Sequence, residues 1–274
     1  MNPISSASGS CCGTVMLVGA GPGDPELLTL KAVRAIRQAT VLLVDDLVGD
    51  GVLRYARRSA RIVHVGKRGG CASTPQAFIE KLMIAEARRG ENVVRLKGGD
   101  PFLFGRGGEE VQRLQDAGIE VRVVHGITAG VAAAGALGAA LTHRDHAQGV
   151  LFITGHARAD DTSGTLPDWA TLGSVAAQGI TLVIYMGVTQ IEAITAGLLH
   201  ALPATTPAAV VQHASLPEQR ELVTTLGELA TALRCAGLGS PAVIVIGDVL
   251  HARAQLTQAP NDSAEQDTLI HQRG

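Results

Sequence analysis

The fold is decided by the stretch Leu96-Lys97-Gly98-Gly99-Asp100-Pro101-Phe102-Leu103-Phe104-Gly105-Arg106-Gly107-Gly108-Glu109-Glu110. It continues a strand pattern that begins at residue 92, and it precedes a helical pattern of apolar residues. A glycine-rich connection at the carboxyl end of a strand is where α/β proteins bind ligands. Gly98 and Gly99 leave room for a ligand beside the backbone, and Asp100 offers a carboxylate to a hydroxyl or a cation.

Short runs of β-branched residues alternate with helical patterns along the rest of the chain. We expect strands at 14–18, 41–44, 62–65, 92–96 and 121–124, and a second series at 150–154, 181–185, 208–212 and 242–246. Asp24-Pro25 and Thr74-Pro75 each indicate a helix start, because a capping side chain precedes a proline. The alternation predicts an α/β fold of two α/β domains with mainly parallel sheets and helices on both faces.

A change in composition after residue 125 separates the two series of strands. The segment 126–140 contains Gly126-Ile127-Thr128-Ala129-Gly130 and then an alanine- and glycine-rich helix. We interpret it as a bridge between an N-terminal domain (14–125) and a C-terminal domain (126–250), with the active-site cleft between them. A plain helix–helix contact explains its small residues equally well. The Ser/Gly-rich segment 1–13 and the polar tail 251–274 are expected to be flexible.

The composition excludes several classes of function. The chain has 274 residues, a formal net charge of −2 and only 3% aromatic residues, so its core is aliphatic and its surface lacks the basic character of nucleic-acid-binding proteins. No apolar run approaches the ~18 residues of a membrane span, and no secretory signal is expected. The four cysteines and the scattered histidines lack metal-binding spacing. We therefore expect no metal, and the reduced thiols of a cytoplasmic protein.

The loop after the first strand, Gly19-Ala20-Gly21-Pro22-Gly23-Asp24, begins like a dinucleotide-binding fingerprint. Asp24 stands where the third glycine belongs and repels phosphate, while Pro22 lacks a backbone donor. The loop therefore favours a neutral or zwitterionic ligand. A purely structural turn remains an alternative.

The carboxylates Asp45 and Asp46 follow the second strand and indicate base chemistry at the edge of the sheet. Because side chains alternate along a strand, at most one of them is expected to be functional, and the other reading is a cap for the following turn.

Basic residues end the neighbouring strands. Lys67 and Arg68 lie in a glycine-rich loop and suit an anionic substrate or a proton transfer, although exposed basic loops are common. With Arg95, Lys97 and Arg106 they predict a basic rim for a polycarboxylate ligand.

Taken together, these segments resemble the tetrapyrrole methylase family. The resemblance runs in order from about residue 15 to residue 248, and its segments are VGAGPGDPELLTLKA (from Val18), VDDLV (Val44), VGKRGG (Val65), VVRLKGGDPFLFGRGGEE (Val93), HGITA (His125), TGH (Thr154), YMG (Tyr185) and PAVIVIGDV (Pro241). The ordered series is far more specific than any one segment.

The resemblance implies a homodimer that binds S-adenosylmethionine between two α/β domains. The activity it implies is C-methylation of uroporphyrinogen III at C2 and C7, which gives precorrin-2 via precorrin-1 for siroheme or cobalamin synthesis. It places the proton acceptor at Asp45 and the proton donor at Lys67. The residues expected to contact the methyl donor are Pro22, Gly98, Gly99, Asp100, Leu103, Thr128, Ala129, Met186 and Ala214. Arg106 and Arg68 are expected to meet the carboxylates of the substrate, which is an inference from their charge.

The sequence departs from the family pattern at two places. Val44 and Asp46 replace a tyrosine and a non-acidic residue around the proposed base, and His213-Ala214-Ser215 replaces a frequent Asn-Gly-Thr. Relatives on this fold methylate later corrin intermediates, diphthine precursors or a ribosomal RNA ribose. The segments VGKRGG and GGDPFLFGRGGEE favour uroporphyrinogen III, while Asp45 and Lys67 argue against a non-catalytic donor-binding protein.

Overall fold

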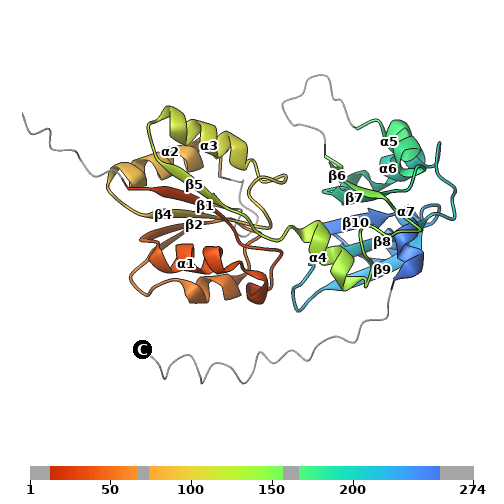
Figure 1. Cartoon of the computed structure of the whole chain (residues 1–274), viewed down its shortest axis with the longest axis horizontal. Coiled ribbons are helices and arrows are strands. Elements are labelled where there is room, and N and C mark those ends of the chain that lie inside the picture. Colours follow the sequence, from red (N-terminus) through yellow and green to blue (C-terminus); the bar gives the residue numbers. More distant parts are fainter. Residues whose placement is uncertain (1–12, 67–73, 157–166, 254–274) are drawn as a thin grey trace, which may run out of the picture.

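The computed structural model describes residues 13–66, 74–156 and 167–253, which form two five-stranded sheets flanked by helices (Figure 1). Lys67, Arg68 and three of the four cysteines lie outside the described residues, as do residues 1–12 and 254–274 of the ends expected to be flexible at 1–13 and 251–274. Gly13 donates to the carbonyl of Ala87 at 2.8 Å. No helix among the described residues is long and apolar enough to cross a membrane.

The first sheet is parallel throughout and has the strand order β3-β2-β4-β1-β5. Its strands are β1 (Val15–Gly19), β2 (Val41–Val44), β3 (Arg61–His64), β4 (Val93–Lys97) and β5 (Val121–Val124). Figure 1 shows α1 (Leu30–Gln38) on one face and α2 (Gln76–Arg88) and α3 (Gly107–Asp116) on the other.

Successive side chains of these strands enter two different cores. Val18, Leu42 and Leu96 pack on the α1 side, whereas Leu17 and Leu43 pack on the side of α2 and α3. This is the period-two alternation of a strand that is buried on both faces.

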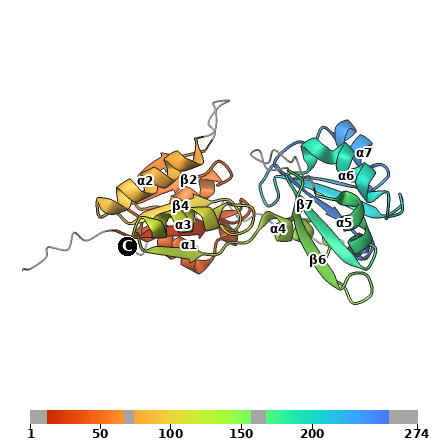
Figure 2. The same ribbon diagram turned by 90° about the horizontal axis from the view of Figure 1, so that it is seen from above.

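The second sheet is mixed and has the order β6-β7-β10-β8-β9. Its strands are β6 (Gly149–Thr154), β7 (Ile180–Tyr185), β8 (Pro207–Gln212), β9 (Arg220–Thr225) and β10 (Ala242–Ile246). One face packs on α5 (Trp169–Ala176), α6 (Ile191–Leu198) and α7 (Leu229–Ala236), and the other face packs on α4 (Ala129–Ala136). Figure 2 shows α4 beside this sheet, directly after the bridge from β5.

The α/β class is as predicted, but the second sheet departs from the expected parallel pairing. Only β6 and β7 pair in parallel, while β10 runs antiparallel to β7 and β8, and β8 is antiparallel to β9. The physical reason is a short turn, residues 213–219, which returns the chain beside β8 without a helical crossover.

The predicted helix starts also need correction. Asp24 caps only a short 3-10 helix (Pro25–Leu27), where its Oδ1 accepts from Glu26 N at 2.7 Å. Thr29 caps α1 instead, because its hydroxyl accepts from Ala32 N at 3.1 Å. At the start of α2, Pro75 occupies the cap position and no side chain caps the helix. The remaining 3-10 helices are Asp50–Tyr55, Val188–Gln190 and Asp248–Ala252.

Candidate functional site

The loop after β1 and the turn after β4 lie side by side and meet the bridge between the sheets. Gly21 N donates to Gly99 O at 3.3 Å, and Gly99 N donates to Gly21 O at 2.7 Å. A Cβ at Gly19 would lie 2.6 Å from both Gly99 O and Gly126 N. Glycine is therefore required at position 19 by the close approach of three chain segments.

Asp100 fixes this meeting point with its carboxylate. Its Oδ1 accepts from Phe102 N at 2.8 Å, and its Oδ2 accepts from Gly126 N at 3.1 Å and lies 3.0 Å from His125 Nδ1. The sequence predicted a carboxylate that is open to a ligand. In the structure, the same carboxylate joins the turn after β4 to the bridge.

Tyr185, at the end of β7, connects the second sheet to the same point. Its hydroxyl lies 2.6 Å from Thr128 Oγ1 and accepts from Gly130 N at 2.7 Å, and its ring lies 4.9 Å from that of Phe104. Burial raises the pKa of Tyr185, so its hydroxyl stays protonated. A Cβ at Gly99 would lie 3.6 Å from Thr128 Cα, which places the turn after β4 against the start of α4.

The turn between β8 and β9 contacts the loop after β1. Asp24 N donates to Ser215 Oγ at 3.0 Å. A Cβ at Gly23 would lie 2.6 Å from Leu216 Cδ2. Ala214, in the same turn, is buried. The two halves therefore meet through loops at two places, here and at Asp100.

Strained backbone is concentrated in these loops. Throughout the described ranges, the non-glycine residues with positive φ are Phe104 (55°), Arg106 (57°), Met186 (54°), His213 (52°) and Ser215 (69°). Such conformations cost free energy and are concentrated at ligand sites and switches. The strain makes this junction a candidate functional site on grounds that do not depend on a sequence motif.

The predicted donor-contact residues all lie on the loops that form this junction. They are Pro22 after β1, the run from Gly98 to Leu103 after β4, Thr128 and Ala129 at the start of α4, Met186 after β7 and Ala214 after β8. Their contact with a methyl donor stays a prediction.

Asp45 lies at the end of β2, and its side chain is 34% exposed. Its Oδ2 is 3.2 Å from Arg95 Nη2, and its Oδ1 accepts from Asp46 N at 3.0 Å. Asp46 faces Gly66, where a Cβ would lie 1.9 Å from Asp46 Oδ1. The two neighbouring acids therefore face different ways. Both lie past the end of β2 at Val44, so strand alternation does not by itself explain their directions.

The prediction of an exposed basic rim is wrong for Arg95 and Lys97. Arg95 and Lys97 are only 2% and 3% exposed, because both point toward α3 and pair with the fully buried Glu110. Burial and then the Arg95 charge lower the pKa of Lys97. Arg106 is exposed and pairs with Glu109 at 2.6 Å.

The sequence reasoning missed Glu110 and Tyr185. Both residues lie in segments that resemble the family, but the sequence does not distinguish them from structural residues. Glu110 is an acidic residue in the first turn of a helix, and Tyr185 is the last residue of a strand. Only the arrangement of the elements in space brings them to the site.

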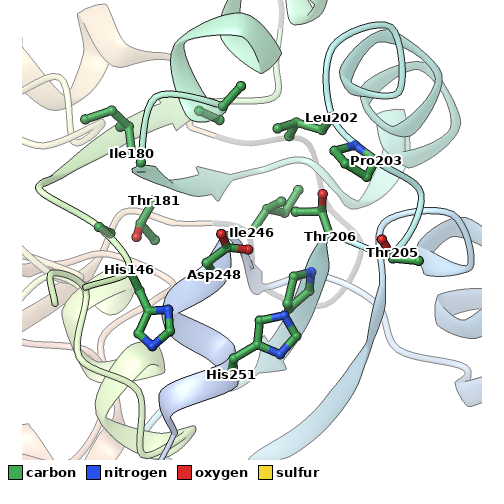
Figure 3. Close-up of a pocket in the computed structure, with 16 residues that line it drawn as sticks. His146, Ile180, Thr181, Leu202, Pro203, Thr205, Thr206, Ile246, Asp248 and His251 are labelled. Atoms are coloured by element: carbon green, nitrogen blue, oxygen red, sulfur yellow. The ribbon is translucent and has the colours of Figure 1, made fainter. Parts of the chain in front are cut away.

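A hollow of ≈ 320 Å³ lies elsewhere, at the opposite end of β7 from Tyr185 (Figure 3). His146, Thr181, Asp248 and His251 line it, and none of the residues predicted from the sequence does. It is therefore not the expected cleft between the domains. Within the described part of the chain, no group of three or more His, Cys, Asp or Glu side chains could hold a metal ion.

Comparison with known proteins gives a consistent result. The sequence matches the family model described as Tetrapyrrole (Corrin/Porphyrin) Methylases over residues 14–230. It is 53% identical to a uroporphyrinogen-III C-methyltransferase from Pseudomonas aeruginosa, over 86% of this chain and 94% of that protein. It is 49% identical to siroheme synthase 2 from Aeromonas hydrophila over 89% of this chain, which spans 50% of that longer protein.

A solved structure agrees with both sequence relatives. It is the uroporphyrin-III C-methyl transferase from Thermus thermophilus complexed with S-adenyl homocysteine. The TM-score is 0.72 at 39% sequence identity, and the match covers 88% of this chain and all of that one.

Proposed function

This chain belongs to the tetrapyrrole methylase family and is a methyltransferase, and we propose from this premise that it transfers two methyl groups from S-adenosylmethionine to uroporphyrinogen III. The groups are added at C2 and C7, so the intermediate with one methyl group is precorrin-1 and the product is precorrin-2. The product feeds siroheme synthesis, cobalamin synthesis or both. The proposed enzyme is a cytoplasmic homodimer that requires no metal.

The observation that carries this proposal is the strained junction of the two sheets. Backbone strain and close glycine contacts occur in the same loops that hold the residues predicted to bind the donor. The relative with bound S-adenyl homocysteine supports the choice of S-adenosylmethionine as donor.

The loop chemistry also suits this donor, which carries a sulfonium, an ammonium and a carboxylate but no phosphate. Pro22 offers no N–H, and Asp24 adds negative charge at the start of the first 3-10 helix, so phosphate is disfavoured there. A Cβ at Gly98 would lie 2.7 Å from Leu47 Cβ, and one at Gly99 would lie 3.6 Å from Thr128 Cα, so these glycines let the turn pack against its neighbours. The donor is proposed to meet the backbone of this turn. Thr128, Ala129, Leu103, Met186 and Ala214 are proposed to complete the donor site.

In the proposed reaction, an electron-rich pyrrole carbon attacks the methyl carbon of the sulfonium. The carbon–carbon bond forms as the carbon–sulfur bond breaks, and its electron pair stays on sulfur, giving S-adenosylhomocysteine. Alignment of the reactants supplies most of the acceleration. Each transfer adds CH3+, so the macrocycle loses one proton net. Asp45 accepts a proton, and the proton that Lys67 donates at another ring position is balanced by a second proton that leaves to solvent.

The substrate carboxylates are proposed to meet Arg106 and Arg68. Arg106 is exposed at the strained loop after β4, where it pairs with Glu109. A bidentate guanidinium suits a carboxylate, and a substrate carboxylate can replace that of Glu109.

The test is direct. Purified protein is incubated without oxygen with enzymatically made uroporphyrinogen III and methyl-labelled S-adenosylmethionine, and the products are identified by mass and by carbon NMR. We expect a product with two labelled methyl groups at C2 and C7, and an early intermediate with one. Donor binding without methylated product contradicts the proposal, and methylation of a later corrin intermediate instead would assign the chain to another step.

A further inference from the structure

Arg95 connects the exposed carboxylate of Asp45 to a cluster of buried charges beneath α3. The cluster consists of Asp45, Arg95, Lys97 and Glu110, and we call it the Arg95 cluster. The exposed fraction of the side chain decreases along the cluster, from 34% for Asp45 to 2% for Arg95 and zero for Glu110. Only one end of the cluster can therefore meet a substrate.

The guanidinium of Arg95 is held on every side. Nη2 lies 3.2 Å from Asp45 Oδ2, and Nε lies 3.4 Å from Glu110 Oε1. Nη1 donates to the backbone carbonyls of Leu43 at 3.5 Å and Leu96 at 3.2 Å. A planar guanidinium with these partners has one orientation, which a flexible lysine ammonium cannot reproduce.

Glu110 is the buried anchor of the cluster. Its Oε1 accepts from Gln76 Nε2 at 2.9 Å and lies 3.2 Å from Lys97 Nζ, in addition to its contact with Arg95. Its Oε2 has no hydrogen-bond partner among the residues that the structure describes. Burying these charges is costly, and stability alone is a weak reason to retain them.

A second ion pair of the same sheet has the opposite arrangement. Arg61 on β3 is half exposed, and its partner Glu86 is buried. Arg61 pairs in register with Val41, the first residue of β2, so it lies at the other end of that strand from Asp45. This pair is the natural control.

We propose that Arg95 is a positioning residue for methyl transfer: it fixes the Asp45 carboxylate toward the substrate, and Glu110 in turn fixes Arg95. The inference rests on the proposed function, because it takes Asp45 as the proton acceptor. Arg95 acts through Asp45, so it governs the rate of the chemical step and not the binding of either substrate.

The test is a double-mutant cycle on the full chain. Steady-state kcat and both KM values are measured for wild type, Arg95→Lys, Asp45→Asn and the double variant. We expect Arg95→Lys to lower kcat by about 10-fold to 100-fold with both KM values within about threefold. In the Asp45→Asn background, Arg95→Lys should lower kcat by less than about twofold, because the carboxylate that it positions is gone.

Two further variants keep the test decisive. Glu110→Gln retains an acceptor for Arg95 and should lower kcat less than Arg95→Lys does; if Arg95→Lys does not fold, Glu110→Gln replaces it in the cycle. Arg61→Lys should leave kcat unchanged. Equal effects of Arg95→Lys with and without Asp45 overturn the inference alone. An Asp45→Asn variant with full kcat overturns the role of Asp45 as proton acceptor and with it the inference, while methyl transfer stands. A wild-type enzyme that makes no methylated product overturns the proposed function.

Discussion

At the scale of single residues, Asp100 joins the turn after β4 to the bridge between the sheets. Asp100→Ala removes the acceptor for Phe102 N and Gly126 N and the partner of His125. We expect a loss of about 2–3 kcal/mol in the free energy of unfolding and weaker donor binding, since the turn that is proposed to bind the donor loses its support. Denaturant unfolding and calorimetry with S-adenosylmethionine measure the two effects.

A matched control is Asp116→Ala on α3. Asp116 is exposed and accepts one side-chain hydrogen bond from Gln112. Its replacement should leave donor affinity unchanged. Equal donor affinity of wild type and Asp100→Ala would remove Asp100 from the site.

Lys97 gives a prediction for the dependence of stability on pH. Burial lowers the pKa of Lys97 in the folded protein below 10.5, so the unfolded chain binds more protons between these two pKa values. The free energy of unfolding of wild type, compared with that of Lys97→Met, should therefore increase as the pH rises from the lowered pKa toward 10.5. It should decrease again as the pH falls through the lowered pKa. Urea unfolding of both proteins at a series of pH values from neutral to alkaline measures the difference; a constant difference contradicts the prediction.

The residue-scale predictions failed where tertiary packing decides the position of a side chain. Asp45 and Asp46 face different ways, as expected, but both lie past the end of β2, where strand alternation no longer applies. Alternation does apply within β4. The same alternation puts Arg95 and Lys97 on one face, but their burial depends on Glu110 arriving from α3. A sequence motif does not reveal that α3 packs over the end of β4 and buries these two side chains.

At the scale of elements, the close approach at Gly19 makes a sharp prediction. Gly19→Ala places a Cβ 2.6 Å from two backbone atoms, which cannot move aside as a side chain can. We expect a loss of about 3 kcal/mol or more in the free energy of unfolding, because overpacked sites are destabilising. Thermal and denaturant unfolding measure it.

Gly135 in α4 provides the control for that substitution. A Cβ there would have nothing within 4 Å, and the residue is exposed in a helix. Gly135→Ala should stabilise the protein by about 0.5–1 kcal/mol, since alanine is the better helix former. Similar losses in the two variants would contradict the role assigned to Gly19.

Strand positions were predictable to within about a residue, because β-branched runs between polar turns mark them clearly. Strand β9 was not predicted: its sequence RELVTT lacks an apolar run, and the strand lies at the edge of its sheet. The direction in which the strands of the second sheet pair could not be predicted from the sequence either. Hydrophobic periodicity gives the face of a strand but not the direction of its neighbour.

At the scale of the whole molecule, the hydrogen bond between Asp24 N and Ser215 Oγ joins the two halves. Ser215→Ala and Ser215→Gly both remove it, and we expect both to weaken donor binding several-fold, in calorimetry, if the contact organises the donor site. Ser215 has φ of 69°, so glycine also relieves strain. Ser215→Gly should unfold at a higher temperature than Ser215→Ala, and unchanged donor affinity in both variants would exclude a role for this contact.

The arrangement of the halves was predicted only as a bridge at residues 126–140. The motifs and the departure at His213-Ala214-Ser215 pointed to the right loops, but not to the contacts among them. Those contacts depend on the relative placement of two sheets, and no local pattern encodes it.

The strand orders show that β1 to β5 form one sheet and β6 to β10 the other. Within the described residues, the backbone therefore crosses from one sheet to the other once, between Val124 and Ala129, and Asp100 accepts a hydrogen bond from Gly126 N in this segment. Rotation of one half against the other turns about the same few bonds that Asp100 restrains. Such a rotation would also separate Asp24 N from Ser215 Oγ, so the contact at Asp100 and the contact at Ser215 restrain the same relative movement of the two halves.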